Sequence, residues 1–69
     1  MARYKLTKEN YILDLTTGRN VAFLLKRNDE WSAHGFFGEC YASADDRMKC
    51  ARAAVVNPRL GKIPAGAAK

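Results

Sequence analysis

Residues 11–40, YILDLTTGRNVAFLLKRNDEWSAHGFFGEC, contain three runs that are rich in β-branched, aromatic and other strand-favouring residues. The runs are 11–16, 20–26 and 31–40, and turn-favouring glycine, asparagine and aspartate lie between them at 17–19 and 28–30. Gly35 and Gly38 weaken the third run and are typical of a bulge. The stretch therefore predicts an antiparallel meander of three strands.

The segment that follows the meander predicts one helix. Ser43 is a suitable N-cap, and Asp45 and Asp46 suit the positive end of the helix dipole. Pro58 requires the helix to end before it. Apolar residues recur at helical spacing, at Ala44, Met48, Ala51 and Val55. The predicted fold class is α+β: a β-β-β-α domain over 10–57, a basic N-terminal segment over 1–9 and a flexible basic tail over 58–69.

The register of the strands predicts which face is buried. Three-residue loops at both turns would pair Leu13 with Phe23 and Leu25 with Ala33, and a one-residue slip would exchange the faces. The helix would then cover Tyr11, Leu13, Leu15, Val21, Phe23, Leu25, Trp31, Ala33 and Phe37. The opposite face would carry Ile12, Leu24, His34 and Phe36, a patch of the kind that marks an interaction surface. In the alternative interpretation, the tail covers this patch with Leu60 and Ile63.

The formal net charge of +5 is concentrated at the two ends of the chain. Residues 1–9 hold three basic groups and one acid, 58–69 hold three basic groups and no acid, and 10–57 hold six of each. Nucleic-acid-binding domains usually concentrate basic residues on one folded face, whereas basic ends often serve solubility. Nucleic-acid binding is therefore the alternative function, and its candidate residues are Lys5, Lys8, Arg59 and Lys62.

The chain offers few groups for catalysis or metal binding. In one continuous strand, His34 would lie roughly 20 Å from Cys40, too far for a nucleophile and its base. One histidine and two separated cysteines do not supply the three or four ligands of a metal site. We expect no catalytic residue, metal, cofactor or small-molecule substrate, and we expect Cys40 and Cys50 to be buried and unreactive. A subunit that contributes one residue to a shared active site is a third class.

Short stretches resemble three unrelated families. Residues 31–34 and 38–43, with the alanine-rich helix after them, look like part of HicB-type antitoxin domains, which neutralise an RNase toxin by covering it. The predicted strands and the helix over 43–55 resemble the end of a double-stranded RNA-binding domain. Residues 57–65 resemble the arm tip of histone-like HU proteins, whose proline wedges between bases. The three resemblances imply different functions, so no family is assigned from them.

The length of 69 residues predicts a single domain of marginal stability, since such a chain hides only about 60% of its unfolded surface. Self-association commonly compensates for a small core, so we expect a homodimer. No apolar run resembles a signal peptide or a membrane span, which indicates the cytoplasm. The leading prediction is a non-enzymatic regulator or inhibitor, of a size that suits a virus-encoded accessory protein. It would bind a protein partner through Ile12, Leu24, His34 and Phe36.

Overall fold

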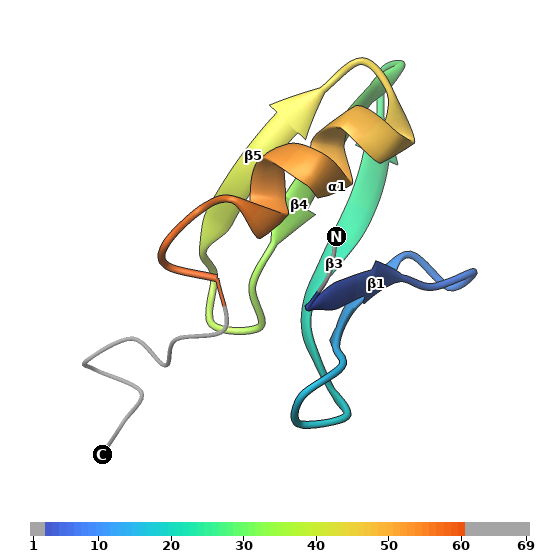
Figure 1. Cartoon of the computed structure of the whole chain (residues 1–69). Coiled ribbons are helices and arrows are strands. Elements are labelled where there is room, and N and C mark those ends of the chain that lie inside the picture. The colour runs from blue at the N-terminus through green and yellow to red at the C-terminus, as the bar shows by residue number, and fades with distance from the viewer. Residues whose placement is uncertain (1–2, 61–69) are drawn as a thin grey trace.

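The computed structural model describes residues 3–60, which form an antiparallel sheet with one helix packed against one of its faces (Figure 1). The elements are β1 (Tyr4–Leu6), β2 (Tyr11–Asp14), β3 (Arg19–Arg27), β4 (Glu30–His34), β5 (Cys40–Ala44) and α1 (Arg47–Val55). The order of the five strands in the sheet is their order along the chain. The α+β class is confirmed, whereas the prediction of three strands in a β-β-β-α topology is wrong.

One additional strand, β1, lies within the segment that was expected to be only a basic extension. It pairs with β2 so that Lys5 is opposite Leu13. The start of the helix holds the turn between these strands, because the Arg47 guanidinium donates to Asn10 Oδ1 at 2.7 Å and to the Thr7 carbonyl at 2.6 Å. A three-residue strand carries too weak a periodic signal to stand out in the sequence.

The other additional strand arises because the predicted run 31–40 folds back on itself. A turn at Gly35–Gly38 divides it into β4 and β5, and the Gly35 N–H donates to the Glu39 carbonyl at 2.9 Å. Gly38 has a φ of 91°, a conformation that favours glycine. The two glycines therefore mark a hairpin turn and not a bulge in one long strand.

The turn between β3 and β4 sets the register of the sheet. Asn28 and Asp29 have φ values of 52° and 63°, as the two central residues of a type I′ hairpin turn require. Arg27 consequently pairs with Glu30, and Leu25 pairs with Ser32. The predicted loop over 28–30 is one residue too long, and this slip inverts β3 relative to β4.

The core lies between the helix and the sheet face that carries Ile12, Leu24 and Ala33. Its buried apolar side chains are Ile12, Ala22, Leu24, Ala33, Tyr41, Cys50, Ala51, Ala54 and Leu60. The predicted core face is wrong for β2 and β3. Of the nine residues expected there, Ala33 is buried and Trp31 and Val21 pack partly against the core, whereas Leu15, Leu25 and Phe37 are exposed.

The helix begins at Arg47, whereas the predicted N-cap at Ser43 would have started it earlier in the chain. Asp46 is the N-cap, and its carboxylate accepts from the N–H groups of Met48 and Lys49. The helix buries Cys50, Ala51 and Ala54, so the predicted stripe is rotated and Met48 is exposed. The helix ends before Pro58, as predicted, and among the described residues it is too short and too polar to cross a membrane.

The segment after the helix returns to the sheet. The Asn57 side-chain amide donates to the Tyr41 carbonyl of β5 at 3.2 Å, and the Leu60 N–H donates to the Asn57 carbonyl at 3.1 Å. These bonds place Leu60 in the core, so it does not cover the other sheet face. Ile63, the second residue of the predicted covering tail, lies outside the described residues.

Candidate docking surface

The sheet face opposite α1 is called the open face here, and five residues define it: Tyr11, Phe23, Leu25, His34 and Phe36. Cross-strand pairing places them together, since Phe23 is opposite both Tyr11 of β2 and His34 of β4. Leu25 and Phe36 are 45% and 52% exposed. No element of the described chain packs over this face.

The rings of the open face touch one another. Phe36, which lies in the β4–β5 turn, stacks with Tyr11 at a centroid distance of 6.3 Å and contacts Phe23 at 5.4 Å. Phe23 in turn contacts the His34 imidazole at 5.8 Å. Such contacts stabilise aromatic pairs beyond the burial of their area, so the four rings form one continuous and mutually supported surface.

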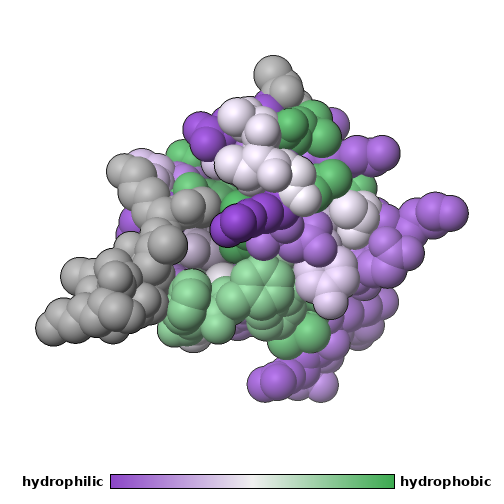
Figure 2. Space-filling model, turned by 90° about the horizontal axis from the view of Figure 1, so that it is seen from below, coloured by the Kyte–Doolittle hydropathy of each residue, from purple (hydrophilic) through white to green (hydrophobic). Residues whose placement is uncertain are grey.

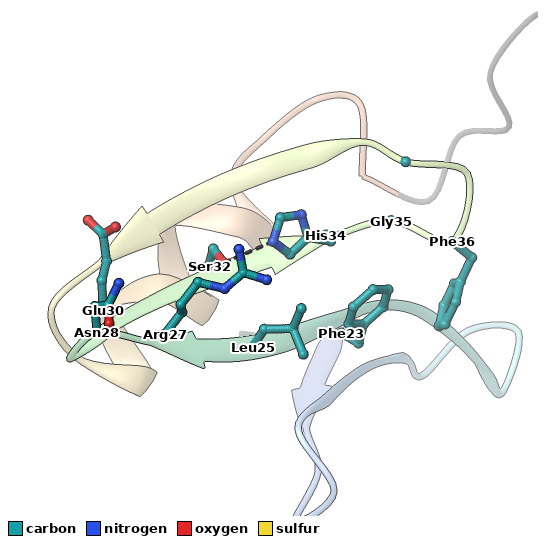
Figure 3. Close-up of a pocket in the computed structure, with 10 residues that line it drawn as sticks. Phe23, Leu25, Arg27, Asn28, Glu30, Ser32, His34, Gly35 and Phe36 are labelled. Carbon is teal, nitrogen blue, oxygen red and sulfur yellow. Dashed lines mark hydrogen bonds between the residues drawn. The ribbon is translucent and has the colours of Figure 1, made fainter.

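A shallow groove of about 640 Å³ runs along the open face. Figure 3 shows Phe36, Phe23 and Leu25 in a row, with His34 and Ser32 beside them and Arg27, Asn28 and Glu30 at the far end. Arg27 and Glu30 are opposite each other across the β3–β4 turn. The groove therefore has an apolar row formed by Phe36, Phe23 and Leu25, polar groups beside that row, and opposite charges at one end.

The structure divides the four predicted contact residues into two pairs. His34 and Phe36 lie on the open face, whereas Ile12 and Leu24 are buried in the core. The prediction for Ile12 and Leu24 is wrong because the β3–β4 turn is one residue shorter than expected, which turns the even-numbered positions of β3 toward the helix. The residues missed for the same reason are Tyr11, Phe23 and Leu25. The adjacent Asn28 and Asp29 favour a two-residue turn, and this signal was available in the sequence.

The residues of the nucleic-acid alternative do not gather on one surface. Lys5 and Lys8 lie in and beside β1, at one edge of the sheet. Arg59 follows Asn57, which is bonded to β5 at the opposite edge. Lys62 lies outside the described residues. The described basic residues of this prediction therefore flank the sheet on two sides.

One polar contact on the open face involves a nucleophile and a base. Ser32 Oγ and His34 Nε2 share a hydrogen bond of 2.8 Å. Within residues 3–60, no carboxylate bonds to His34, so the third group that orients a catalytic base is not supplied. The Ser32–His34 bond instead fixes the imidazole beside Phe23.

The cysteines differ from the expectation that both are buried. Cys50 is buried, and burial raises the pKa of its thiol. Cys40 is exposed and is paired with His34 across β4 and β5, since the turn at 35–38 brings these positions together. The predicted separation of His34 and Cys40 is therefore wrong. Within residues 3–60 no three histidine, cysteine, aspartate or glutamate side chains cluster as metal ligands would, and the absence of a metal or cofactor stays a prediction.

Two acidic side chains, Asp14 and Glu39, are buried and line a second hollow of the molecule. Burial favours the protonated form of Asp14, but a hydrogen bond from the Thr16 N–H and the Arg3 guanidinium outweigh it and lower the pKa of this carboxyl. Glu39 is 9% exposed, and its charge adds to burial in raising the pKa of Tyr41. Asp14 is thus paired with Thr16 and Arg3 within the fold. Glu39 instead contributes to the raised pKa of the neighbouring Tyr41.

Comparison with protein-family models, with curated proteins and with solved structures finds no match to this chain.

Proposed function

We propose that this chain is a non-enzymatic regulator or inhibitor that binds a protein partner through the open face. The observation that supports the proposal is a continuous set of aromatic rings and an exposed leucine on a sheet face that the described chain leaves uncovered. Exposed apolar patches of this kind usually mark interaction sites. The cytoplasm is the compartment we propose for this activity.

The distribution of large apolar side chains also supports a partner. Most of the buried core residues are small, and Ile12 and Cys50 are the largest side chains that are fully buried. Other large apolar side chains are exposed, among them Leu25 and Phe36. A sheet normally buries a hydrophobic face against another layer, so a second covering layer would stabilise this one.

The chemistry of the open face suits a protein better than a nucleic acid. Interface centres are enriched in aromatic residues and depleted in charge. The open face has the same composition, except at the end that carries Arg27 and Glu30. Nucleic-acid binding is the second candidate, because exposed rings on a sheet can stack on bases. That mode needs cations beside the rings, and the described candidates Lys5, Lys8 and Arg59 lie at opposite edges.

Affinity capture with matched variants tests the proposal. The tagged wild type, Leu25→Glu and Ala53→Glu are compared as baits in extract of the native cell, with equal expression and melting temperature as the condition. Both positions are exposed, but Ala53 is on the helix and Leu25 is on the open face. A partner held by the wild type and by Ala53→Glu, and lost with Leu25→Glu, supports the proposal.

Nuclease treatment separates the two candidate functions. Capture that survives nuclease and changes little between low and moderate salt supports a protein partner. Capture that is lost with nuclease and falls steeply with salt supports the nucleic-acid alternative, because phosphate contacts release counterions. Equal loss with both glutamate variants contradicts a role for the open face.

A further inference from the structure

A second hollow, of about 380 Å³, lies at the end of the sheet that carries the β2–β3 and β4–β5 turns (Figure 1). Figure 2 shows this end of the molecule, where hydrophobic side chains lie directly beside hydrophilic ones. We call it the Glu39 pocket, and the residues that matter in it are Glu39, Asp14, Arg19, Phe36 and Phe37. Phe36 lines both this pocket and the groove of the open face, so the two hollows are neighbours that meet at this ring.

Glu39 is the unusual group in the pocket. Its Oε1 atom accepts a hydrogen bond from the Phe37 N–H at 3.2 Å, but its buried Oε2 atom has no hydrogen-bond partner among residues 3–60. A Cβ atom at Gly35 would collide with this carboxylate, so the glycine leaves the space that Glu39 occupies. A buried carboxylate oxygen without a donor is costly, and the fold holds it in place nonetheless.

The other charges of the pocket do not relieve Glu39. Arg3 is engaged with Asp14, whose carboxylate lies 3.3 Å from the guanidinium. Arg19 is exposed and makes no salt bridge within the described chain, and water can solvate it there. Arg19 is thus exposed to water, whereas Glu39 Oε2 is buried and is not. The group that would satisfy the pocket is a hydrogen-bond donor with positive charge.

We propose that the Glu39 pocket binds a guanidinium group, with the Glu39 carboxylate as its acceptor and the rings of Phe36 and Phe37 beside it. These rings are 52% and 61% exposed, so their faces are accessible. A guanidinium donates in a planar fork to carboxylates, stacks on aromatic rings and is weakly hydrated, whereas an ammonium is a compact and strongly hydrated charge.

The guanidinium belongs to an arginine of the protein docked on the open face, and this assignment of its source rests on the proposed function. The shared Phe36 is the reason, since a partner that covers this ring on the open face lies next to the pocket. Arginine is also among the residues that most often carry interface energy. The presence of a guanidinium site, in contrast, can be tested on this chain alone.

The test is a titration of the ¹⁵N-labelled full chain with N-acetyl-arginine amide, followed by backbone amide shifts. We expect saturable shifts at Phe37, Glu39 and Tyr41. In Glu39→Gln the affinity should fall roughly tenfold, because a hydrogen bond to a charged group is lost. Leu25→Glu should bind the probe like the wild type even though it loses the partner, so failure of the site and failure of the docking surface give different patterns.

Three further arms complete the test. Phe37→Leu keeps the carboxylate and should weaken the probe, which covers the case in which Glu39→Gln does not fold. N-acetyl-lysine amide should bind more weakly, and equal binding would overturn the preference for a guanidinium. No saturable shift in the wild type, or equal affinity in Glu39→Gln, would overturn the site. Binding seen only in Arg19→Gln would show that Arg19 fills the pocket and would overturn a partner's arginine as the occupant.

Discussion

Leu24 and Leu25 are adjacent in β3 and face opposite sides of the sheet, so a matched pair of alanine variants tests which side is the core. Leu24 is 3% exposed and belongs to the core, whereas Leu25 is 45% exposed on the open face. Replacing a buried leucine with alanine removes its transfer free energy and leaves a cavity, at a cost of about 3 kcal/mol. For Leu25, about half of whose surface is already in water, we expect a cost of about 1 kcal/mol or less.

These costs are large compared with the stability of the domain. A chain of this length is expected to unfold with a free energy of about 5 kcal/mol, so Leu24→Ala should retain a minor part of it. Near the melting temperature, about 1 kcal/mol corresponds to roughly 4–8 °C in a domain of this size. Leu24→Ala should therefore melt far below the wild type, and Leu25→Ala only slightly below it.

Urea unfolding, followed by the fluorescence of the single Trp31 and by far-UV circular dichroism, measures both variants. Runs at two protein concentrations separate folding from self-association, because a dimer makes the apparent stability depend on concentration. If Leu25→Ala costs as much free energy as Leu24→Ala at the lower concentration, the face that carries Leu25 is covered within the fold and is not an open face.

Four other consequences can be measured with standard methods. Sedimentation should detect self-association of the wild type at micromolar concentration, and Leu25→Glu should abolish it without unfolding, because an unpaired buried charge costs several kcal/mol; a wild type that stays monomeric at high concentration would reserve the face for a different partner. Asp46→Ala should lower the free energy of unfolding by about 1 kcal/mol, since the N-cap bonds to Met48 and Lys49 are lost, and an unchanged urea midpoint would contradict this role. Gly35→Ala should destabilise the fold and shift the Glu39 amide, because its Cβ displaces the carboxylate. The free energy of unfolding should fall above about pH 8.5, because burial raises the pKa of the Cys50 thiol in the folded chain. The neutral thiol contributes its full stability below the unfolded pKa, and this contribution is lost as the pH rises above it. Cys50→Ala should flatten that limb of the pH profile.

The sequence predicts most of the elements because their signals are local. The central strand, the helix and its end before Pro58 follow from β-favouring residues, from helical spacing and from the restricted residue before proline. The fragments that were missed or merged are those with weak local signals. β1 has three residues, and the turn at Gly35–Gly38 lies within an otherwise apolar run.

Composition does not indicate which face of the sheet is buried. The residues assigned to the candidate site depend on that choice. Residues 21–25 read VAFLL and are apolar on both sides of the strand, so alternation gives no direction. The direction came from turn length, and one residue of error inverted β2 and β3 while leaving His34 on the correct side. Phe36 and His34 could therefore be predicted as open-face residues, whereas Ile12 and Leu24 are recognised as core only when Asn28 and Asp29 are taken as a two-residue turn.

The Glu39 pocket could not be predicted at all. Its parts come from two turns, and only the folded chain places Phe36 and Phe37 beside the buried Glu39. Nothing in a run such as GFFGEC indicates that its single acid is buried with one carboxylate oxygen lacking a donor. Features that arise from the meeting of distant turns depend on register, which is the weakest part of a sequence-based prediction.

Hydroxyl-radical footprinting of the captured complex tests the central claim, that the open face is the docking surface, most directly. Phe36 and Met48 have comparable exposure, 52% and 40%, but lie on the open face and on the helix respectively. Each residue is compared with itself in the free and the bound chain, so their different intrinsic reactivities do not matter. We predict strong protection of Phe36 and none of Met48 in the complex. Protection of Met48 with Phe36 still oxidised at its free rate would contradict the account.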